Sequence, residues 1–245
     1  MNRFQVIEMT VFNEGSHTEY LKAVMFDFDD TMINMREASL TAFNMILEKN
    51  QLPTITMDEM LSTWDSTWRD VIKSLAPPNV DVNALMRKIG QEYMSLFEEV
   101  HIDHSELIPG TIEVLNFLYE NNIQVSIVSR RSTKAVSMQL KKFSLDDKVH
   151  CIVGFDSVRN QKPSPEGLFL ASYVFGVEPL NCLVVGDSPS DIKAAKAFGA
   201  SMCAVLTGPY KKEKILREEP DFIIDSVINL PAIIHRFFRL ENHII

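Results

Sequence analysis

Six short apolar runs, each bounded by turn residues, constrain this fold more than any other feature of the sequence. They are rich in β-branched residues and carry apolar side chains at successive positions. Strands of this kind are buried on both faces, as in a parallel sheet covered by helices. The expected strands are Ala23–Asp27, Ile123–Ser129, His150–Gly154, Cys182–Asp187, Cys203–Leu206 and Asp221–Asp225.

The segments between these runs carry helical periodicity and helix-end signals. One helix is expected over Ser164–Phe175, capped by its serine and followed by Gly176, and another over Ser190–Phe198, followed by Gly199. The alternation of strand and helix predicts an α/β protein built on a doubly wound, Rossmann-like parallel sheet. The remaining helices expected between strands are Thr111–Asn121 and Ser132–Phe143.

The alternation is interrupted after the first strand. About 70 residues follow that lack convincing strands and contain amphipathic helical segments such as Glu37–Lys49 and Val82–Val100. We therefore expect a core domain over residues 1–33 and 108–245, and a small helical domain over residues 34–107, placed over the end of the sheet. A terminal helix is expected over Ala232–Ile245.

Composition narrows the possible partners. The chain has 245 residues, 46% of them hydrophobic, and a formal net charge of -9, which makes a nucleic-acid footprint improbable. Cys151, Cys182 and Cys203 lie far apart without metal-ligand spacing, so we expect reduced thiols and a cytoplasmic protein. No apolar stretch is long enough to span a membrane, and the first twenty residues do not resemble a signal peptide. We expect a monomer.

Polar residues collect where the expected strands end. Asp27, Asp29 and Thr31 follow the first strand, and Ser129 ends the second. Lys162 follows the third strand, and the segment "VVGDSPSD" closes the fourth. Because ligands of doubly wound sheets bind beyond the carboxyl ends of the strands, these side chains are expected to share one site.

Such a set of side chains has a definite chemical use. Clustered carboxylates repel one another unless a cation joins them, and Mg²⁺ prefers one or two carboxylates together with substrate phosphate. A carboxylate can attack phosphorus, a second carboxyl group can protonate the leaving oxygen, and a lysine can offset the developing charge. Phosphoryl transfer assisted by Mg²⁺ would use such a set of side chains.

Four segments, "DFDDT", "SIVS", "QKPSPEG" and "GDSPSD", resemble in this order the four motifs of the haloacid dehalogenase superfamily. The resemblance covers the chain from Ala23 to about Leu206 and implies the fold of that superfamily for the core. The inserted helices resemble the cap of the subfamily that includes phosphoglycolate phosphatase and β-phosphoglucomutase.

The resemblance also implies roles for individual residues. Asp27 matches the nucleophile, and Asp29 matches the general acid and base, with its backbone carbonyl on the metal. Lys162 matches the motif lysine. Thr31 and Ser129, together with Lys162, match phosphate-binding positions. Asp187 and Asp191, together with Asp27 and Asp29, match metal-binding positions.

Two positions depart from the pattern of the superfamily. Asp30 stands where phosphatases commonly have glycine, so it is expected to affect the turn after the nucleophile. Arg130 and Arg131 follow Ser129 where small or amide residues are common. Arg130 is expected either to crowd the phosphate pocket or to contact an anionic substrate, and we include it among the phosphate-binding candidates.

The sequence thus predicts a Mg²⁺-dependent phosphatase, a phosphoric monoester hydrolase acting on small phosphorylated metabolites through an aspartyl-phosphate. Asp29 favours this class, because dehalogenases and phosphonatases of the superfamily generally lack an acid there. Two alternatives stay open. A phosphomutase would return the phosphoryl group to another hydroxyl and release no phosphate. A non-catalytic binding module would keep its partner after Asp27→Asn.

Other polar and aromatic residues receive simpler interpretations. Trp64 and Trp68 are spaced like one packing face of a helix. His101 and His104 are interpreted as surface or hinge residues, because no third ligand accompanies them. The lysines near residue 212 are interpreted as a solvated face.

Overall fold

The computed structural model describes residues 10–11, 20–63, 68–78 and 80–240. The chain divides into two compact units. One, here called the core unit, comprises Met1–Ile33 and Leu107–Ile245, and the other, the helical unit, comprises Asn34–Glu106. Each is described by itself.

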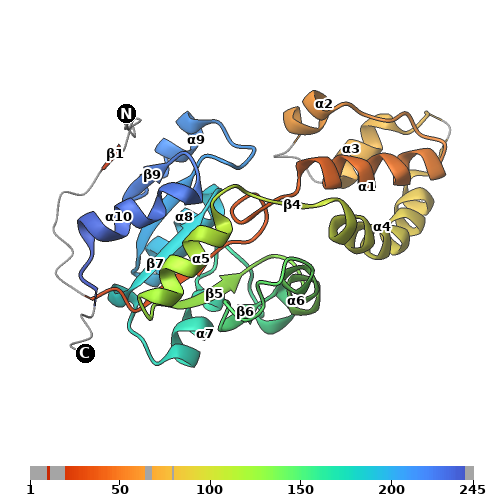
Figure 1. Cartoon of the computed structure of the whole chain (residues 1–245). Helices are drawn as coiled ribbons and strands as arrows, with labels where there is room; N and C mark the ends of the chain where they lie inside the picture. Colours follow the sequence, from red (N-terminus) through yellow and green to blue (C-terminus); the bar gives the residue numbers. More distant parts are fainter. Residues whose placement is uncertain (1–9, 12–19, 64–67, 79, 241–245) are drawn as a thin grey trace, which may run out of the picture. The chain divides into compact units, whose positions relative to one another are not determined.

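A seven-stranded sheet forms the centre of the core unit, in the order β1-β9-β8-β7-β2-β5-β6 (Figure 1). All neighbouring strands are parallel except β1 and β9, which pair antiparallel. This arrangement confirms the predicted α/β class with a doubly wound parallel sheet. The strands are β1 (Thr10–Val11), β2 (Ala23–Phe26), β5 (Gln124–Val128), β6 (Cys151–Val153), β7 (Cys182–Gly186), β8 (Ser201–Val205) and β9 (Phe222–Ile224).

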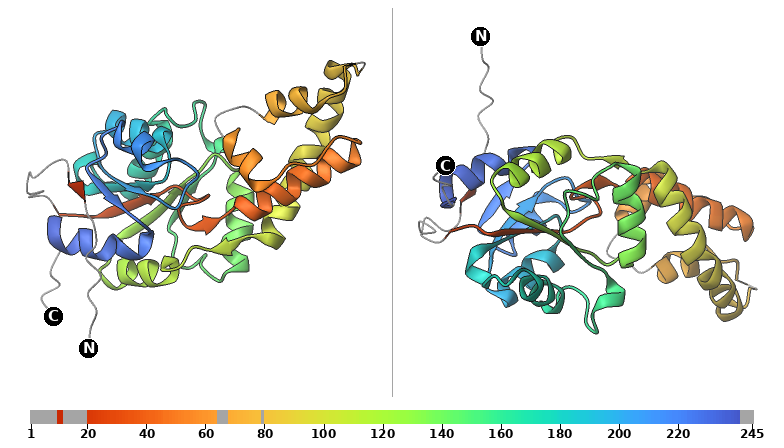
Figure 2. Two further views of the ribbon diagram at one scale, coloured as in Figure 1. Left: turned by 90° about the horizontal axis from the view of Figure 1, so that it is seen from above. Right: turned by 60° about the horizontal axis from the view of Figure 1, so that its bottom comes forward.

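Helices cover both faces of this sheet (Figure 2). The helices α5 (Thr111–Glu120) and α10 (Leu230–Phe237) lie on one face, and α7 (Glu166–Phe175) and α8 (Pro189–Phe198) pack together on the other. The strands between them are apolar on both sides because both sides are buried. The described part of the unit also contains the α-helices α6 (Thr133–Lys142) and α9 (Lys212–Leu216).

The register of the central strands sets the position of the site. Phe26, the last residue of β2, lies beside Ile127 of β5 and Val185 of β7. The carboxyl ends of these three strands are therefore level, and the residues that follow them emerge at one edge. Full burial of the strand side chains, each worth roughly 1.5–3 kcal/mol for Val, Leu, Ile or Phe, holds that edge in place.

Local signals start and end the helices, although two starts differ from those predicted. Gly176 and Gly199 end α7 and α8 at φ of 65° and 88°, which glycine adopts without strain. The predicted serine cap of α7 is wrong, because the helix begins at Glu166 with Pro165 as its N-cap. The other helix, α8, begins at Pro189, directly after its cap Ser188, rather than at Ser190.

In its described residues the helical unit contains four α-helices: α1 (Arg36–Lys49), α2 (Met57–Ser62), α3 (Trp68–Leu75) and α4 (Val82–His104). The pair α1 and α4 makes the main packing contact. Buried apolar residues between the helices include Phe43, Ile46, Leu47, Ile72 and Ile89. The two connections to the core unit, β3 (Ile33–Asn34) and β4 (Glu106–Leu107), pair as a two-stranded sheet.

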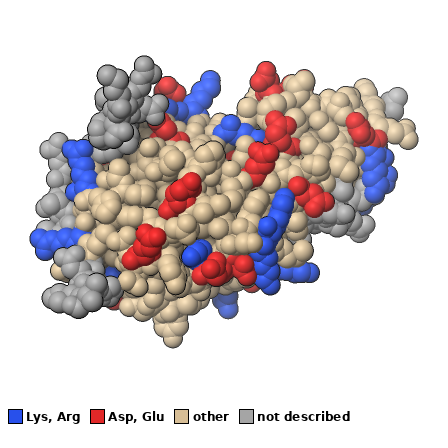
Figure 3. Space-filling model, viewed as in Figure 1, with Lys and Arg blue, Asp and Glu red and all other residues tan. Residues whose placement is uncertain are grey.

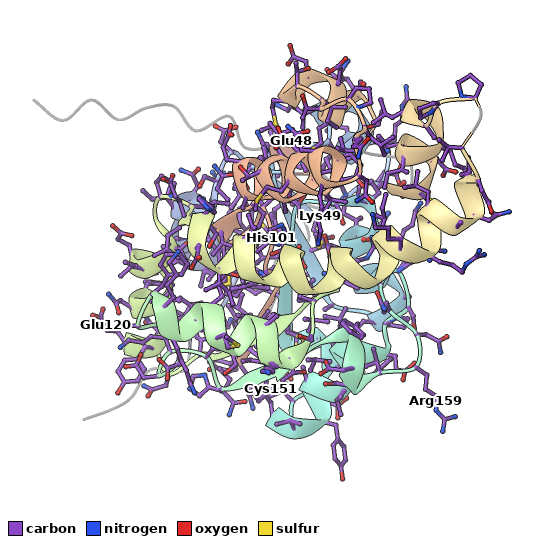
Figure 4. All side chains as sticks on the ribbon, turned by 90° about the vertical axis from the view of Figure 1, so that its right-hand side faces the viewer. Glu48, Lys49, His101, Glu120, Cys151 and Arg159 are labelled. Carbon is purple, nitrogen blue, oxygen red and sulfur yellow. The ribbon has the colours of Figure 1, made fainter. Side chains whose placement is uncertain are left out.

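The interpretation of His101 as a surface or hinge residue is wrong. His101 is 2% exposed and lies where α4 packs on α1 (Figure 4). Its Nε2 is 3.3 Å from the Ser39 hydroxyl of α1, so it completes a polar contact inside the unit. His104, three residues further along, is exposed as predicted.

The predicted terminal helix is too long. It ends at Phe237, and Phe238 has extended backbone with φ of -119° and ψ of 149°. The chain then forms a bridge to Tyr20, and Arg239 accepts a hydrogen bond from the Leu21 amide at 2.9 Å. A sheet-like contact with the segment before β2 therefore replaces the last turns of the helix. The side chains of Trp64 and Trp68 and residues 241–245 lie outside what the structure describes.

Three further properties concern membrane-spanning helices, the distribution of surface charge and the cysteines. Over the described ranges, no helix has both the length and the apolar character needed to cross a membrane. On the face drawn in Figure 3, basic and acidic side chains are interspersed rather than gathered by sign. All three cysteines are free thiols, and Cys182 and Cys203 are buried.

Candidate active site

The ends of β2 and β7 bring the first two acidic residues together. Asp27 follows β2 directly, and its amide donates to the Val185 carbonyl of β7 at 2.8 Å. Asp187 follows β7 directly. Side chains alternate along the extended chain, so the buried Phe28 anchors the segment while Asp27 and Asp29 are directed away from that anchor. The predicted meeting of strand ends is therefore present.

Lys162 joins the segments that carry Asp27 and Asp191. Its Nζ lies 2.5 Å from Asp27 Oδ1 and 2.6 Å from Asp191 Oδ1. The lysine side chain is 8% exposed. Burial by itself lowers the pKa of this ammonium group, but the two carboxylates, Asp191 first, outweigh burial and raise the pKa above its ordinary value. The group therefore remains charged in this site.

Side-chain hydrogen bonds to the backbone hold the loop that carries Lys162. The Glu166 carboxylate, at the start of α7, accepts from the amides of Arg159 and Asn160 at 2.8 and 3.0 Å. Arg130 donates from Nη2 to the Lys162 carbonyl at 3.0 Å. The side chain of this predicted phosphate-binding residue is exposed. Its observed contact is with the loop that carries Lys162.

Thr31 and Gly208 enclose Asp187. The Thr31 hydroxyl is fully buried and donates to Asp187 Oδ1 at 3.3 Å. A side chain at Gly208 would collide with the Asp187 carboxylate, so only glycine lets this loop approach. The neighbouring Thr207 donates to the Asp30 carbonyl at 2.6 Å. Neither Thr207 nor Gly208 is predicted from the sequence, because both follow β8 in a segment without charge.

Asp191 has protein donors on both oxygens. It is the third residue of α8, and its Oδ2 accepts from the Ser188 hydroxyl and amide at 2.5 and 3.1 Å in a capping box. Its Oδ1 pairs with Lys162. Gly186 makes room for it, since a Cβ there would lie 2.6 Å from the aspartate Cβ. The Asp191 carboxylate therefore both caps α8 and orients Lys162.

The site concentrates negative charge. Carboxylate oxygens of Asp27, Asp187 and Asp191 lie within 4.8 Å of one another. Burial, followed by the neighbouring Asp191 and Asp29, raises the pKa of Asp27 to about 6 despite Lys162. Burial, followed by the neighbouring Asp27, Asp191 and Asp30, raises the pKa of Asp187 well above its usual range. Carboxylates crowded in this way fit a hard divalent cation with oxygen ligands.

A tight turn after the nucleophile candidate accommodates Asp30. Its backbone adopts φ of 56°, in the left-handed region, and its amide donates to the Ile33 carbonyl at 2.7 Å. Aspartate is one of the few non-glycine residues found readily in that region. Asp30 therefore adopts a backbone conformation that glycine would also adopt without strain.

Asp29 faces Arg131, the second arginine after Ser129. Arg131 Nη1 lies 3.5 Å from Asp29 Oδ1 and donates to Gln139 Oε1 at 2.5 Å. Burial raises the pKa of Asp29, and the guanidinium opposes this rise. Ser129 is buried, and its hydroxyl oxygen accepts from the Arg131 amide at 3.1 Å. Neither Arg131 nor Gln139 is among the predicted site residues.

The predicted residues thus form two adjoining groups. In the first, Lys162 pairs with Asp27 and Asp191, and Asp187, held by Thr31, lies within 4.8 Å of both carboxylates; the second joins Asp29 to Ser129 through Arg131. A buried ammonium between carboxylates, at the carboxyl edge of a doubly wound sheet, is the arrangement of an α/β enzyme site.

The chain belongs to the haloacid dehalogenase-like hydrolase family, whose match spans residues 24–205. Among curated relatives, a phosphoglycolate phosphatase from Salmonella paratyphi A is 29% identical over 237 residues, covering 87% of this chain and 92% of that protein. Phosphoglycolate phosphatase 1 from Pseudomonas aeruginosa is 26% identical, covering 87% of this chain and 79% of that protein.

A solved structure agrees with this assignment. A haloacid dehalogenase superfamily hydrolase of subfamily IA from Geobacter sulfurreducens matches with a TM-score of 0.70 and 25% identity, covering 91% of this chain and 99% of the other. The resemblance predicted from the four motifs is confirmed. The predicted enzyme class, a phosphoric monoester hydrolase, agrees with both comparisons.

Proposed function

We propose that this chain is a Mg²⁺-dependent phosphatase of small phosphorylated metabolites that works through an aspartyl-phosphate on Asp27. The observation that carries the proposal is the placement of Lys162 between Asp27 and Asp191, with Asp29 two residues from the nucleophile candidate. The relatives named phosphoglycolate phosphatase support the same reaction class.

In the first step, an oxygen of Asp27 attacks phosphorus, and the bond from phosphorus to the alcohol oxygen breaks. The electron pair of that bond stays on the leaving oxygen, which takes a proton from the Asp29 carboxyl group. Lys162 offsets the charge on the attacking carboxylate and the phosphoryl oxygens, a contribution of electrostatic stabilisation that does not itself consume a proton.

In the second step, the Asp29 carboxylate accepts a proton from water while the water oxygen attacks phosphorus. The bond from phosphorus to Asp27 breaks, which restores the Asp27 carboxylate and releases inorganic phosphate. Asp29 ends the cycle protonated, as it began, so one water is consumed in each turnover.

The acidic cluster fits the magnesium ion that the family commonly uses. Asp27 and Asp187, with the Asp29 carbonyl, are the proposed ligands, and Mg²⁺ would offset their charge and hold substrate phosphate. Asp191 is close enough to be a ligand, but its oxygens already accept from Ser188 and pair with Lys162. We therefore propose that Asp191 acts mainly by orienting Lys162.

The remaining site residues have supporting roles in this proposal. Ser129, whose hydroxyl proton is available to an acceptor, binds a phosphoryl oxygen. Thr31 acts on phosphate through its backbone position, because its hydroxyl is engaged with Asp187. Arg130 steadies the lysine loop while its exposed guanidinium attracts the anionic substrate. The helical unit is proposed to act as the cap that excludes water and selects the alcohol portion of the substrate.

The test measures phosphate release from phosphoglycolate, sugar phosphates, nucleotides and 4-nitrophenyl phosphate. Each substrate is assayed with Mg²⁺, with EDTA and with the Asp27→Asn variant. We expect release that requires Mg²⁺ and falls by at least about 10⁴-fold in the variant, as is typical when a covalent nucleophile is lost. Asp29→Asn, given the aryl phosphate, is expected to accumulate a phosphoryl group on the peptide that carries Asp27.

Two outcomes would overturn the proposal. Conversion of a sugar phosphate to its isomer without phosphate release would indicate a mutase. Absence of both reactions, with partner binding retained in Asp27→Asn, would indicate a binding module. Cell fractionation and sedimentation test the accompanying predictions of a cytoplasmic location and a monomer.

A further inference from the structure

Two consecutive arginines after Ser129 have opposite environments. Arg130 is exposed, whereas Arg131 is 9% exposed. A guanidinium removed from water costs free energy unless charged or polar partners replace the water. The surroundings of Arg131 should therefore reveal what its burial achieves.

The backbone of Arg131 is held at both of its polar atoms. Its amide donates to the Ser129 hydroxyl at 3.1 Å, and its carbonyl accepts from the Phe155 amide at 3.0 Å. The short segment between β5 and α6 is thereby fixed to the strand before it and to the loop after β6. The Arg131 side chain therefore extends from a backbone segment that is held in place.

The guanidinium spans α6 and the turn after β2. Its Nη1 donates to Gln139 Oε1, on the buried face of α6, and pairs with Asp29 Oδ1. Its Nη2 is buried and has no hydrogen-bond partner among the described residues. A buried guanidinium that is only partly satisfied does not repay its desolvation by stability, so a functional reason for it is expected.

Asp29 benefits from such a partner. Its side chain is 35% exposed, and within the described ranges Arg131 provides its one ion pair. A carboxyl group that transfers a proton must hold one oxygen within reach of the reacting oxygen, and small misplacements reduce the rate strongly. A guanidinium bound to Oδ1 orients the carboxyl group and leaves Oδ2 for that transfer.

We propose that Arg131, held by Gln139, is a positioning residue for Asp29 in the phosphatase reaction. The proposal rests on the proposed function, because it presumes that Asp29 transfers the proton. Arg131 itself touches no reacting atom. Its loss is expected to affect only the steps in which a proton moves to the leaving oxygen or from water.

Because Arg131 should affect only the proton-transfer steps, the rate loss in an Arg131 variant should depend on the leaving group of the substrate. An alkyl phosphate needs a proton on its departing oxygen, whereas 4-nitrophenolate leaves without one. The constant kcat/KM covers the steps up to departure of the alcohol. It should therefore fall in an Arg131 variant for the alkyl substrate and remain almost unchanged for the aryl substrate.

The experiment compares Arg131→Gln, Arg131→Lys and wild type with Mg²⁺ on phosphoglycolate, glycerol phosphate and 4-nitrophenyl phosphate. For Arg131→Gln we expect kcat/KM to fall about 10–100-fold on the alkyl phosphates and less than about 3-fold on the aryl phosphate. The aryl substrate should also give a burst of nitrophenolate followed by slow turnover. Arg131→Lys should recover part of the loss. Lys134→Gln, an exposed lysine in the first turn of α6, is the matched control.

A double variant separates positioning from a structural role. In the Asp29→Asn background, Arg131→Gln should cause little further loss on alkyl phosphates, because the group it positions is gone. Equal losses on alkyl and aryl phosphates, or additive losses in the double variant, would overturn the proposal. A rise in KM for phosphoglycolate alone would overturn it in favour of a substrate contact. Wild type that releases no phosphate would instead overturn the proposed function, and this inference with it.

Discussion

The carboxyl edge of the sheet and the interior of the helical unit both bury polar groups, but they do so differently. At the edge, Lys162 and the carboxylates Asp27, Asp187 and Asp191 are packed together, and burial raises the pKa of Asp27 and Asp187. Inside the helical unit, the surroundings are apolar and His101 meets a neutral hydroxyl.

Burial therefore stabilises the helical unit, whereas at the sheet edge it perturbs the charged groups of the site. Apolar packing between α1 and α4 stabilises the helical unit directly. The acidic cluster costs stability until a cation or substrate offsets its charge, as is common where a site is arranged for chemistry rather than for folding. Changes at the edge should therefore act chiefly on activity, and changes in the helical interior chiefly on stability.

Beyond the nucleophile itself, the largest loss of activity is expected from Lys162→Met. Removal of the ammonium leaves two carboxylates facing each other and removes the positive charge that faces the phosphoryl group. We expect kcat to fall by about 10³-fold, equivalent to about 4 kcal/mol, because preorganised charge is worth that much in a buried site. Phosphate release on the preferred substrate measures it, and a variant that keeps a tenth of wild-type activity would contradict this reading of the edge.

Ile46→Ala tests the other half of the comparison. Ile46 is fully buried between the helices of the helical unit. Its truncation should cost about 3 kcal/mol of stability through lost apolar burial and the cavity left behind. Amide hydrogen exchange should locate the loss in α1 and α4, and kcat measured well below the melting temperature should change little. Loss of protection in the sheet instead would show that the two units unfold together.

Asp27→Asn should stabilise the protein in EDTA while abolishing activity. The native state holds the Asp27 proton more tightly than the unfolded chain, because burial raises the pKa from 3.8 to about 6. The resulting stabilisation is complete below the unfolded pKa and is lost as pH rises through the native pKa. The variant escapes this loss, so at pH 7.5 it should be more stable by about 2 kcal/mol, and the difference should vanish near pH 4.

Thermal unfolding across this pH range measures the effect of the Asp27 substitution. Addition of Mg²⁺ should stabilise wild type more than the variant, since a cation that binds the native state shifts its equilibrium. A variant that is less stable than wild type in EDTA at neutral pH would mean that the ion pair with Lys162 outweighs the crowding of the carboxylates.

Lys193→Met should have the smallest effect and is the matched control for Lys162. The Lys193 Nζ pairs with Glu218 at 3.1 Å, but its side chain is largely exposed. Exposed pairs contribute about 0–1 kcal/mol, so stability should change by less than about 0.5 kcal/mol and kcat should stay at the wild-type value. A large loss of activity here would show that charge outside the edge also supports catalysis.

The elements of the core could be predicted because their signals are local. A strand buried on both faces is apolar at successive positions, and glycine after an apolar helix marks its end, so β2, β5, β7 and α7 lie close to their predicted ranges. The terminal helix was overestimated because its end depends on the pairing of Arg239 with residues near Tyr20.

The site was predictable at the level of segments and less so at the level of contacts. Arg131 has a local signal, because alternation in an extended chain puts it on the same side as Ser129, opposite Arg130. The burial of His101 had no such signal, because a histidine on an amphipathic helix suits either surface or interior. Its partner, Ser39, lies 62 residues away.

The sequence by itself determined the order of strands and helices, the family, and the four strand-end segments that carry the chemistry. Tertiary structure alone decided which atoms meet: Lys162 with Asp27 across 135 residues, Thr31 with Asp187 across 156, and Arg131 with Asp29 across 102. The physical reason is that strand and helix formation follow from neighbours in the chain. A side-chain contact instead depends on sheet register and loop paths that only the packed core fixes.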